Sequence, residues 1–262
     1  MDLAAERPAP ARSLAPREHG AWGQLGVPLA ASLSVARPTA AGVALALSAV
    51  ALFAAHEPLL VALGHRGPRA LREDGPRARR RLAALSAVGA SLGLAGLAAA
   101  PGARVVCALP LALAAAVGAF IARRAERTAL GVTTAAAALA AASAPVMIAS
   151  GVPVRTALWA WAAWAVGFAL VTPAVRGAIA HARAPSPLAQ RAVALVPPLA
   201  ALVALAVVGP AWSALGACPF ALAAFVLVIA PPSPRHLKRV GWALVASSLA
   251  AGAALVVALR TS

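Results

Sequence analysis

One uninterrupted apolar run decides the fold: TAAGVALALSAVALFAAHEPLLVAL, residues 39–63. An α-helix needs about 20 consecutive apolar residues to cross the hydrocarbon core of a bilayer. This run is long enough, and its only charged residue is Glu57. In lipid, every backbone N–H and C=O group must find a partner within the protein, so a helix is the expected spanning form. The run therefore predicts a transmembrane helix.

The rest of the chain repeats this pattern. Hydrophobic residues make up 62% of the 262 residues, and charged residues only 11%. Soluble proteins carry about 25% charged residues, and a soluble chain of this length could not hide so much apolar surface. We predict an all-α, polytopic membrane helix bundle with a tail at 1–19 and a single transmembrane domain over 20–262. The predicted spans are residues 20–36, 39–63, 82–100, 105–122, 128–150, 156–175, 192–208, 211–230 and 240–259. There are thus about nine transmembrane helices, or eight if the first, which contains Pro28, is re-entrant.

Positive charge predicts the orientation of these helices. All but four of the 23 Lys and Arg residues fall on the side of the membrane that holds the N-terminus. The exceptions are Arg37, Arg104, Arg155 and Arg260. The two longest connections on the basic side, residues 64–81 and 176–191, are read as polar loops. Because Lys and Arg accumulate in cytoplasmic loops, we predict a cytoplasmic N-terminus and an outside C-terminus.

The strong positive charge does not indicate nucleic-acid binding. The formal net charge is +16, but the basic residues stand in short pieces between apolar runs, with no soluble module to read a groove. The lipid bilayer is the expected partner. The basic loops either contact anionic lipid or phosphate groups or serve only to set the topology. Cys107 and Cys218 lie in apolar runs without metal-ligand spacing.

An unusual motif, R-E-H-G-A-W, occupies residues 17–22 at the start of the first predicted helix. This motif resembles the start of the YwiC-like family of bacterial membrane proteins. Hydropathy, loop placement and the closing basic segment LKRVGW, residues 237–242, agree with that resemblance. It implies a multi-pass protein of the bacterial inner membrane and brings no biochemical activity with it.

Two readings of the motif remain open. Glu18 lies where a carboxylate complements the positive end of the helix dipole, and Trp22 lies where indole rings concentrate at the membrane interface. With Arg17, these residues form either a topological anchor or part of a binding site.

A second polar feature is His56-Glu57, inside the span at residues 39–63. Glu57 lies about six residues, or roughly 9 Å, from the cytoplasmic end of that helix. Charges at such depth are costly and are usually functional or paired. The structural alternative is that Glu57 pairs with a loop arginine such as Arg66 and serves only to hold the helix bundle together.

The first predicted helix begins on the side where the second one ends, and antiparallel neighbours usually pack together. We therefore expect the two features to approach each other. The candidate catalytic residues are Glu57, His56 and His19, and the candidate binding residues are Arg17, Glu18, Trp22 and Arg66, with Gln24 and His65 nearby.

We predict no metal site, although the cofactor requirement stays open. The His and Glu residues stand in adjacent pairs, and neighbours on a helix point about 100° apart, unlike ligands spaced by three or four residues. The sequence contains no G-x-S-x-G, Walker-type or H-E-x-x-H motif.

The layout also resembles UbiA-type prenyltransferases, which implies Asp-rich motifs that bind a magnesium diphosphate. This sequence has only Asp2 and Asp74, so those oxygen ligands are missing. Two classes of function remain, and whether the chain is an enzyme is left open. One is a membrane enzyme or carrier for a lipid, isoprenoid or small anionic substrate. The other is a non-catalytic membrane subunit or assembly factor.

Overall fold

The computed structural model describes residues 13–16, 19–184, 186–233 and 237–261. These residues form α-helices and one short 3-10 helix, and none of them forms a strand. The helices are α1 (His19–Val35), α2 (Ala40–Ala54), α3 (His56–Ala62), α4 (Pro68–Ala99), η1 (Pro101–Ala103), α5 (Ala108–Ala122), α6 (Ala129–Ala141), α7 (Ser143–Ala149), α8 (Val154–Arg183), α9 (Leu188–Val193), α10 (Val196–Val208), α11 (Ala211–Ile229) and α12 (Leu237–Thr261). The all-α prediction is confirmed.

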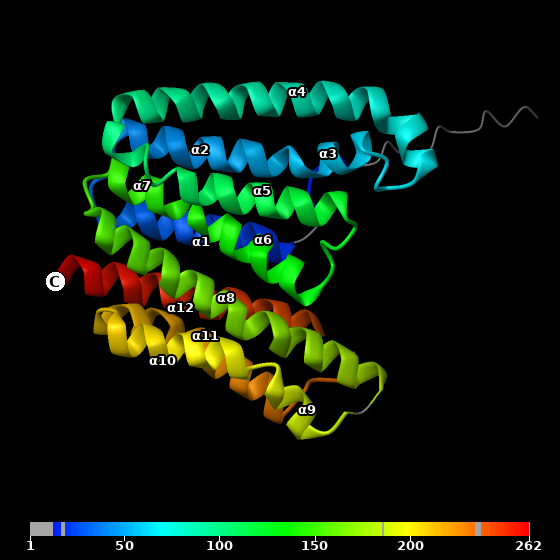
Figure 1. Ribbon diagram of the computed structural model, residues 1–262, viewed down its shortest axis with the longest axis vertical. Helices are drawn as coiled ribbons and strands as arrows, with labels where there is room; N and C mark the ends of the chain where they lie inside the picture. The colour runs from blue at the N-terminus through cyan, green and yellow to red at the C-terminus, as the bar shows by residue number, and fades with distance from the viewer. Residues whose placement is uncertain (1–12, 17–18, 185, 234–236, 262) are drawn as a thin grey trace, which may run out of the picture.

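The helices lie side by side in one elongated bundle (Figure 1). Helix α4 forms one edge of the bundle, and α9, α10 and α11 lie at the other. The chain turns between α3 and α4, between α5 and α6, and between α8 and α9 at the same end, which we call the basic end. The α4–α5, α7–α8 and α10–α11 connections and the C-terminus lie at the opposite end (Figure 1). Successive long segments therefore alternate in direction.

Six helical segments are long and apolar enough to cross a bilayer. They are Ala40–Ala62, Pro68–Ala99, Ala129–Ala149, Val154–Arg183, Ala211–Ile229 and Arg239–Thr261. Helices α5 and α10 are shorter but also apolar. Large apolar side chains such as Leu94, Val105 and Val207 point outward and are exposed, as expected of a surface that faces lipid. The chain is therefore a helical membrane protein.

Helix α1 runs from one end of the bundle to the other. At the basic end, the ring of Trp22 contacts Phe53 of α2. At the opposite end, the Nε of Arg260 donates a hydrogen bond of 2.9 Å to the carbonyl oxygen of Ser34. Between them, Leu25 and Leu29 are buried. Helix α1 thus lies inside the bundle, in contact with α2, α6, α7 and α12.

Two of the predicted spans are each divided into two helices by a proline. Helix α2 ends at Ala54 and α6 ends at Ala141, each four residues before a proline, Pro58 and Pro145. Proline has no N–H group to donate to the carbonyl four residues back, and its ring crowds that carbonyl. The pairs α2/α3 and α6/α7 nevertheless continue along one path each, and each pair forms one candidate span.

The prediction of long basic loops is wrong. Helix α4 begins at Pro68, so most of the expected loop at residues 64–81 is helical. Helix α8 continues to Arg183, and α9 follows within the second expected loop, 176–191. Arg and Ala favour helices, and charged side chains reach water at a helix end as readily as in a loop. The charges mark where the helices leave the apolar region, not where they stop.

Two other predicted spans begin later than expected. Helix α10 begins at Val196 rather than at residue 192. Pro197 and Pro198 then lie in its first turn, where their missing N–H groups need no partner. Helix α5 begins at Ala108 rather than at residue 105, after the 3-10 turn of η1 and an irregular turn.

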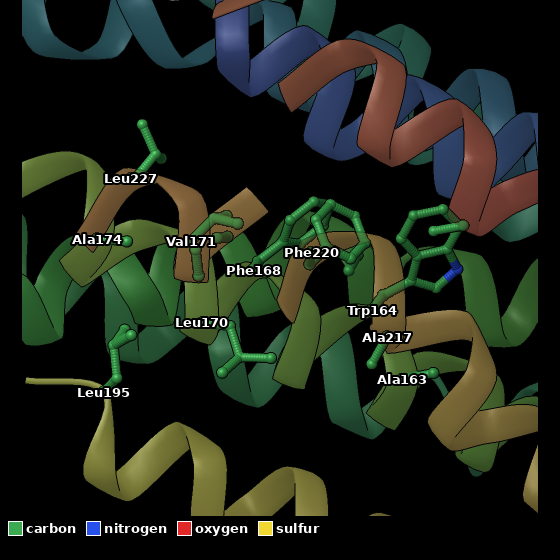
Figure 2. Packing of buried hydrophobic residues seen from close by; sticks show 14 of the residues in the cluster. Ala163, Trp164, Phe168, Leu170, Val171, Ala174, Leu195, Ala217, Phe220 and Leu227 are labelled. Atoms are coloured by element: carbon green, nitrogen blue, oxygen red, sulfur yellow. The ribbon is translucent and has the colours of Figure 1, made fainter. Parts of the chain in front are cut away.

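Aromatic side chains fill the interface between α8 and α11. Figure 2 shows the rings of Trp164, Phe168 and Phe220 gathered there. The centroids of Phe168 and Phe220 lie 5.2 Å apart, and those of Trp164 and Phe220 lie 6.0 Å apart, in the edge-to-face geometry that aromatic pairs favour. Gly167 makes this contact possible, because a Cβ atom there would lie 2.3 Å from Cδ2 of Phe220.

Small residues bring α2 and α4 together. Gly89, Gly93 and Gly96 lie on one face of α4, and a Cβ atom at any of them would come within 3 Å of a side chain of α2. The hydroxyl of Ser48 donates to the carbonyl oxygen of Gly89 at 2.7 Å. Close approach through small residues is typical of membrane helices, whose association depends on packing rather than on the hydrophobic effect.

Candidate functional site

The start of α1 lies beside the end of α2 at the basic end. The ring centroids of Trp22 and Phe53 lie 4.8 Å apart at an interplanar angle of 85°. The indole N–H of Trp22 also donates to the carbonyl oxygen of Pro16 at 3.3 Å. Phe53 lies one helical turn before His56 and Glu57. Trp22, the last residue of the R-E-H-G-A-W motif, and the His-Glu pair therefore share one end of the bundle.

The segment before α1 packs against the same region. Leu14 is fully buried and forms an apolar cluster with Val61 of α3 and Ala78 of α4. This contact holds residues 13–16 against α3 and α4. The polar groups at the basic end of α3 are thereby covered by both α4 and the N-terminal segment.

A tight turn connects α3 to α4 and carries Arg66. Gly64 and Gly67 adopt φ values of 74° and 95°, a region that favours glycine over residues with a Cβ atom. Backbone N–H groups of Gly64 and His65 donate to the carbonyl oxygens of Val61 and Leu60, at 3.0 and 2.9 Å. The turn reverses the chain so that Arg66 points back towards α3.

Arg66 and Glu57 form a bidentate ion pair. The Nε of Arg66 donates to Oε1 of Glu57 at 2.9 Å, and the Nη2 of Arg66 donates to Oε2. The Glu57 side chain is only 2% exposed, whereas that of Arg66 is 25% exposed. Two parallel hydrogen bonds between a guanidinium and a carboxylate are among the strongest side-chain contacts. The pairing expected of Glu57 in its purely structural role is therefore present.

The other candidate residues are only partly brought together. His56 and His65 are half-buried at this end, as is Gln24 of α1. Arg17 and Glu18 lie outside the described residues, and the side chain of His19 is likewise not described. The expected approach of Glu18 and His19 to His56 and Glu57 stays a prediction.

Two ion pairs near this site escaped the sequence analysis. Asp74 is buried, and its Oδ1 lies 3.7 Å from the Nη1 of Arg77. On the outer face of α4, the Nε of Arg69 donates to Oε1 of Glu73 at 2.7 Å. The signal was available in the spacing of three and four residues, which is that of ion pairs on a helix. Reading residues 64–81 as a loop concealed it.

The described residues contain no group of three His, Cys, Asp or Glu side chains placed to hold one metal ion. The chemistry that this end can offer is thus a buried carboxylate neutralised by a guanidinium, with imidazole groups alongside. If the ion pair opens, the guanidinium of Arg66 can bind an anionic group, and the carboxylate of Glu57 can accept a hydrogen bond or a proton.

The comparison with protein families matches α1 to α7 with a known family. The profile of the YwiC-like protein family covers residues 15–148, half of the chain. This range includes every candidate site residue and ends in α7, so α8 to α12 lie beyond it. No curated protein and no solved structure was found to match the chain. On the extent of the family match, this protein belongs to the YwiC-like family.

Proposed function

We propose that this protein crosses the bacterial inner membrane nine times, with its basic end in the cytoplasm, and serves as a non-catalytic membrane subunit or assembly factor. The single observation that carries this role is the bidentate Glu57–Arg66 ion pair. It engages both carboxylate oxygens of the buried Glu57 and joins residues only nine positions apart. Such a pair fastens α3 to the turn before α4.

The number of crossings is supported by the alternating direction of the segments and by the path of α1. Helix α5, of 15 residues, is about 22 Å long, shorter than the roughly 30 Å hydrocarbon core. The 3-10 helix η1 and the turn after it extend this segment towards the end opposite the basic end. Helix α9 and the turn at residues 194–195 lengthen α10 in the same way at the basic end.

Reporter fusions test the topology. We expect a reporter inserted in the α5–α6 connection, residues 123–128, to be active in the cytoplasm, and one at the C-terminus to be active outside. The basis is the excess of Lys and Arg at the basic end. Signals from the same side at both positions would refute nine crossings.

A double-mutant cycle tests the role of the ion pair. We expect Glu57→Gln and Arg66→Gln each to lower the melting temperature and the cellular abundance, because each leaves one charge without its main partner. Breaking a buried pair costs about 3–5 kcal/mol, and we expect about 1–3 kcal/mol here because Arg66 is a quarter exposed. The double variant should recover part of this loss, because no unpaired charge remains.

The exposed Arg69–Glu73 pair is the matched control for this cycle. Arg69→Gln and Glu73→Gln change the charge in the same way on the same hairpin and should leave melting and abundance close to those of the unmodified protein. Normal melting and abundance of both Glu57→Gln and Arg66→Gln would contradict a structural role for the ion pair.

A second candidate function is a membrane enzyme or carrier for a lipid, isoprenoid or small anionic substrate, with its site at the cytoplasmic ends of α1 and α3. The observation that favours it is the contact of Trp22 with Phe53, which lies one helical turn before the buried Glu57. Complementation of a deletion strain separates the two functions. Loss of activity in His56→Gln or Glu57→Gln at normal abundance would support the enzyme or carrier. Loss that follows abundance would support the subunit.

A further inference from the structure

An apolar groove opens between α11 and α12 at the basic end. Its volume is about 420 Å³, within the range of small-molecule sites. Leu222 and Val226 of α11 and Val240 and Leu244 of α12 form its walls, and Pro232 lies at the connection between the helices. At the other end, the two helices approach closely, since a Cβ atom at Gly216 would lie 2.6 Å from a methyl carbon of Leu255. The helices are thus in close contact near the C-terminus and separate towards the basic end.

The groove faces the side of the bundle that lipid covers. Leu222 and Val226 are 66% and 51% exposed, and Trp242, on the neighbouring turn of α12, is 68% exposed. The hydroxyl of Ser247, at the inner end, donates to the carbonyl oxygen of Ala243 at 3.0 Å. Its hydrogen-bonding capacity as a donor is used within α12, so the inner part of the groove suits an apolar chain.

The mouth of the groove carries a positive charge. Arg239 lines it and is exposed. The sequence from residue 127 to the end contains no Asp or Glu, so α8 to α12 supply no carboxylate side chain to their own cations. The contrast with α3 and α4 is sharp, because Arg66, Arg69 and Arg77 all pair with carboxylates. These helices therefore offer Arg239 no carboxylate side chain, which leaves it open to an anionic group at the mouth of the groove.

From this geometry we propose that the α11–α12 groove binds one anionic phospholipid. One acyl chain lies between Leu222, Val226 and Leu244, and the phosphate pairs with Arg239. From Arg239 to Ser247 the groove extends about 12 Å along α12, less than half of the roughly 30 Å hydrocarbon core. It therefore receives the part of a chain next to the headgroup. Anionic lipids of the cytoplasmic leaflet meet the groove at this depth, with the basic end in the cytoplasm.

This inference rests on the proposed orientation, with the basic end in the cytoplasm, but not on the proposed role, and it concerns helices outside the family match. Its failure would leave the Glu57–Arg66 experiment untouched, because the two sites share no residue.

Native mass spectrometry of the full chain, released from detergent, tests the proposal. The probes are phosphatidylglycerol and phosphatidylcholine with identical acyl chains, and inorganic phosphate alone. We expect phosphatidylglycerol to bind about tenfold more tightly than phosphatidylcholine, and Arg239→Gln to weaken it about five- to tenfold. Arg123→Gln, which removes an exposed charge at the same end, should bind like the unmodified protein.

Groove-filling variants locate the acyl chain. Ala243→Phe places a ring in the groove from α12, and Ala223→Phe places one from α11. Each variant should weaken the binding of both lipids and leave the binding of phosphate unchanged. A melting curve shows whether each variant is folded. If neither phenylalanine variant folds, the exposed change Arg239→Gln still tests whether the groove binds an anionic lipid. The proposal would be overturned if the two lipids bound equally tightly, or if Arg239→Gln and Arg123→Gln had the same affinity for phosphatidylglycerol. It would also be overturned if free phosphate displaced the lipid completely.

Discussion

At the scale of single residues, the buried ion pair of Glu57 and Arg66 allows little change in the geometry around it. Glu57 is buried among apolar helices, where an isolated carboxylate would be costly. The cost is offset because one guanidinium, placed by a turn that contains two glycines of positive φ, reaches both oxygens. The turn and the ion pair therefore depend on each other. A Cβ atom at Gly64 or Gly67 would strain the turn and displace Arg66.

Gly167 is a second residue without room for change. We expect Gly167→Ala to destabilise the protein by about 1–3 kcal/mol, because its Cβ atom would lie 2.3 Å from the Phe220 ring and would force the aromatic cluster apart. Gly118→Ala in α5 is the control, since nothing lies within 4 Å of its Cβ atom. That change should be neutral or slightly stabilising, through the better helix propensity of Ala. Thermal melting of the purified variants checks both, and equal melting would contradict the packing.

At the scale of elements, neither proline nor charge ends a helix by itself. Helices α2 and α6 end four residues before Pro58 and Pro145, each of which removes a hydrogen bond to a specific carbonyl. Pro28, Pro76, Pro173 and Pro219, in contrast, lie inside continuous helices. Charge does not end α4 either. The first half of α4 is rich in Arg and still helical, and burial of Asp74 and Ala78 fixes it against its neighbours.

Hydrogen exchange tests the helical state of this basic segment. We expect the amides of residues 72–81 of α4, which lie past its first turn, to exchange clearly more slowly than those of the α5–α6 connection at residues 124–128. The N–H groups of a continuous helix open together with their neighbours, whereas in the connection those of Arg124, Ala125 and Thr128 are bonded only within isolated turns. Both segments lie at the same end of the bundle, which makes the comparison matched. Equally fast exchange in both segments would show that residues 72–81 form a loop rather than a helix.

At the scale of the whole molecule, α1 joins the two parts of the bundle. It contacts α2, α6 and α7 on one side and α12 on the other. Gly252 of α12 lies against Val27, and Arg260 reaches the carbonyl oxygen of Ser34. The family match stops in α7, yet the helix that opens it packs on the last helix of the chain. The C-terminal helices therefore support the region shared with the family.

This dependence predicts the effect of enlarging Gly252. A Cβ atom there would lie 3.3 Å from a Val27 methyl and 3.6 Å from the Trp164 ring, so Gly252→Leu should separate α12 from α1 and α8. We expect a loss of about 1–3 kcal/mol and a lower melting temperature. Gly241→Leu, on the same helix with nothing within 4 Å, should melt normally. Similar melting of the two variants would show that α1 does not depend on α12.

The sequence alone was sufficient to place the candidate site region but not to describe it. The position of Glu57 inside an apolar run identified it as paired or functional, and Arg66 was named as a partner nine residues away. Whether Glu57 is paired with Arg66 depends on the direction in which the turn between α3 and α4 points the Arg66 side chain. Asp74 and Arg77 were missed for a related reason, since their spacing has meaning only once the segment is known to be a helix.

The sequence by itself determined that this is an all-helical membrane protein, where its apolar segments lie and which end of the bundle is basic. These properties follow from local composition, because about 20 apolar residues suffice for a spanning helix whatever surrounds it. The tertiary structure alone decided the central position of α1, the contact of Gly167 with Phe220, the closing of Glu57 by Arg66 and the groove beside Arg239. Each of these depends on which helix faces meet, and faces meet through packing between residues far apart in the chain.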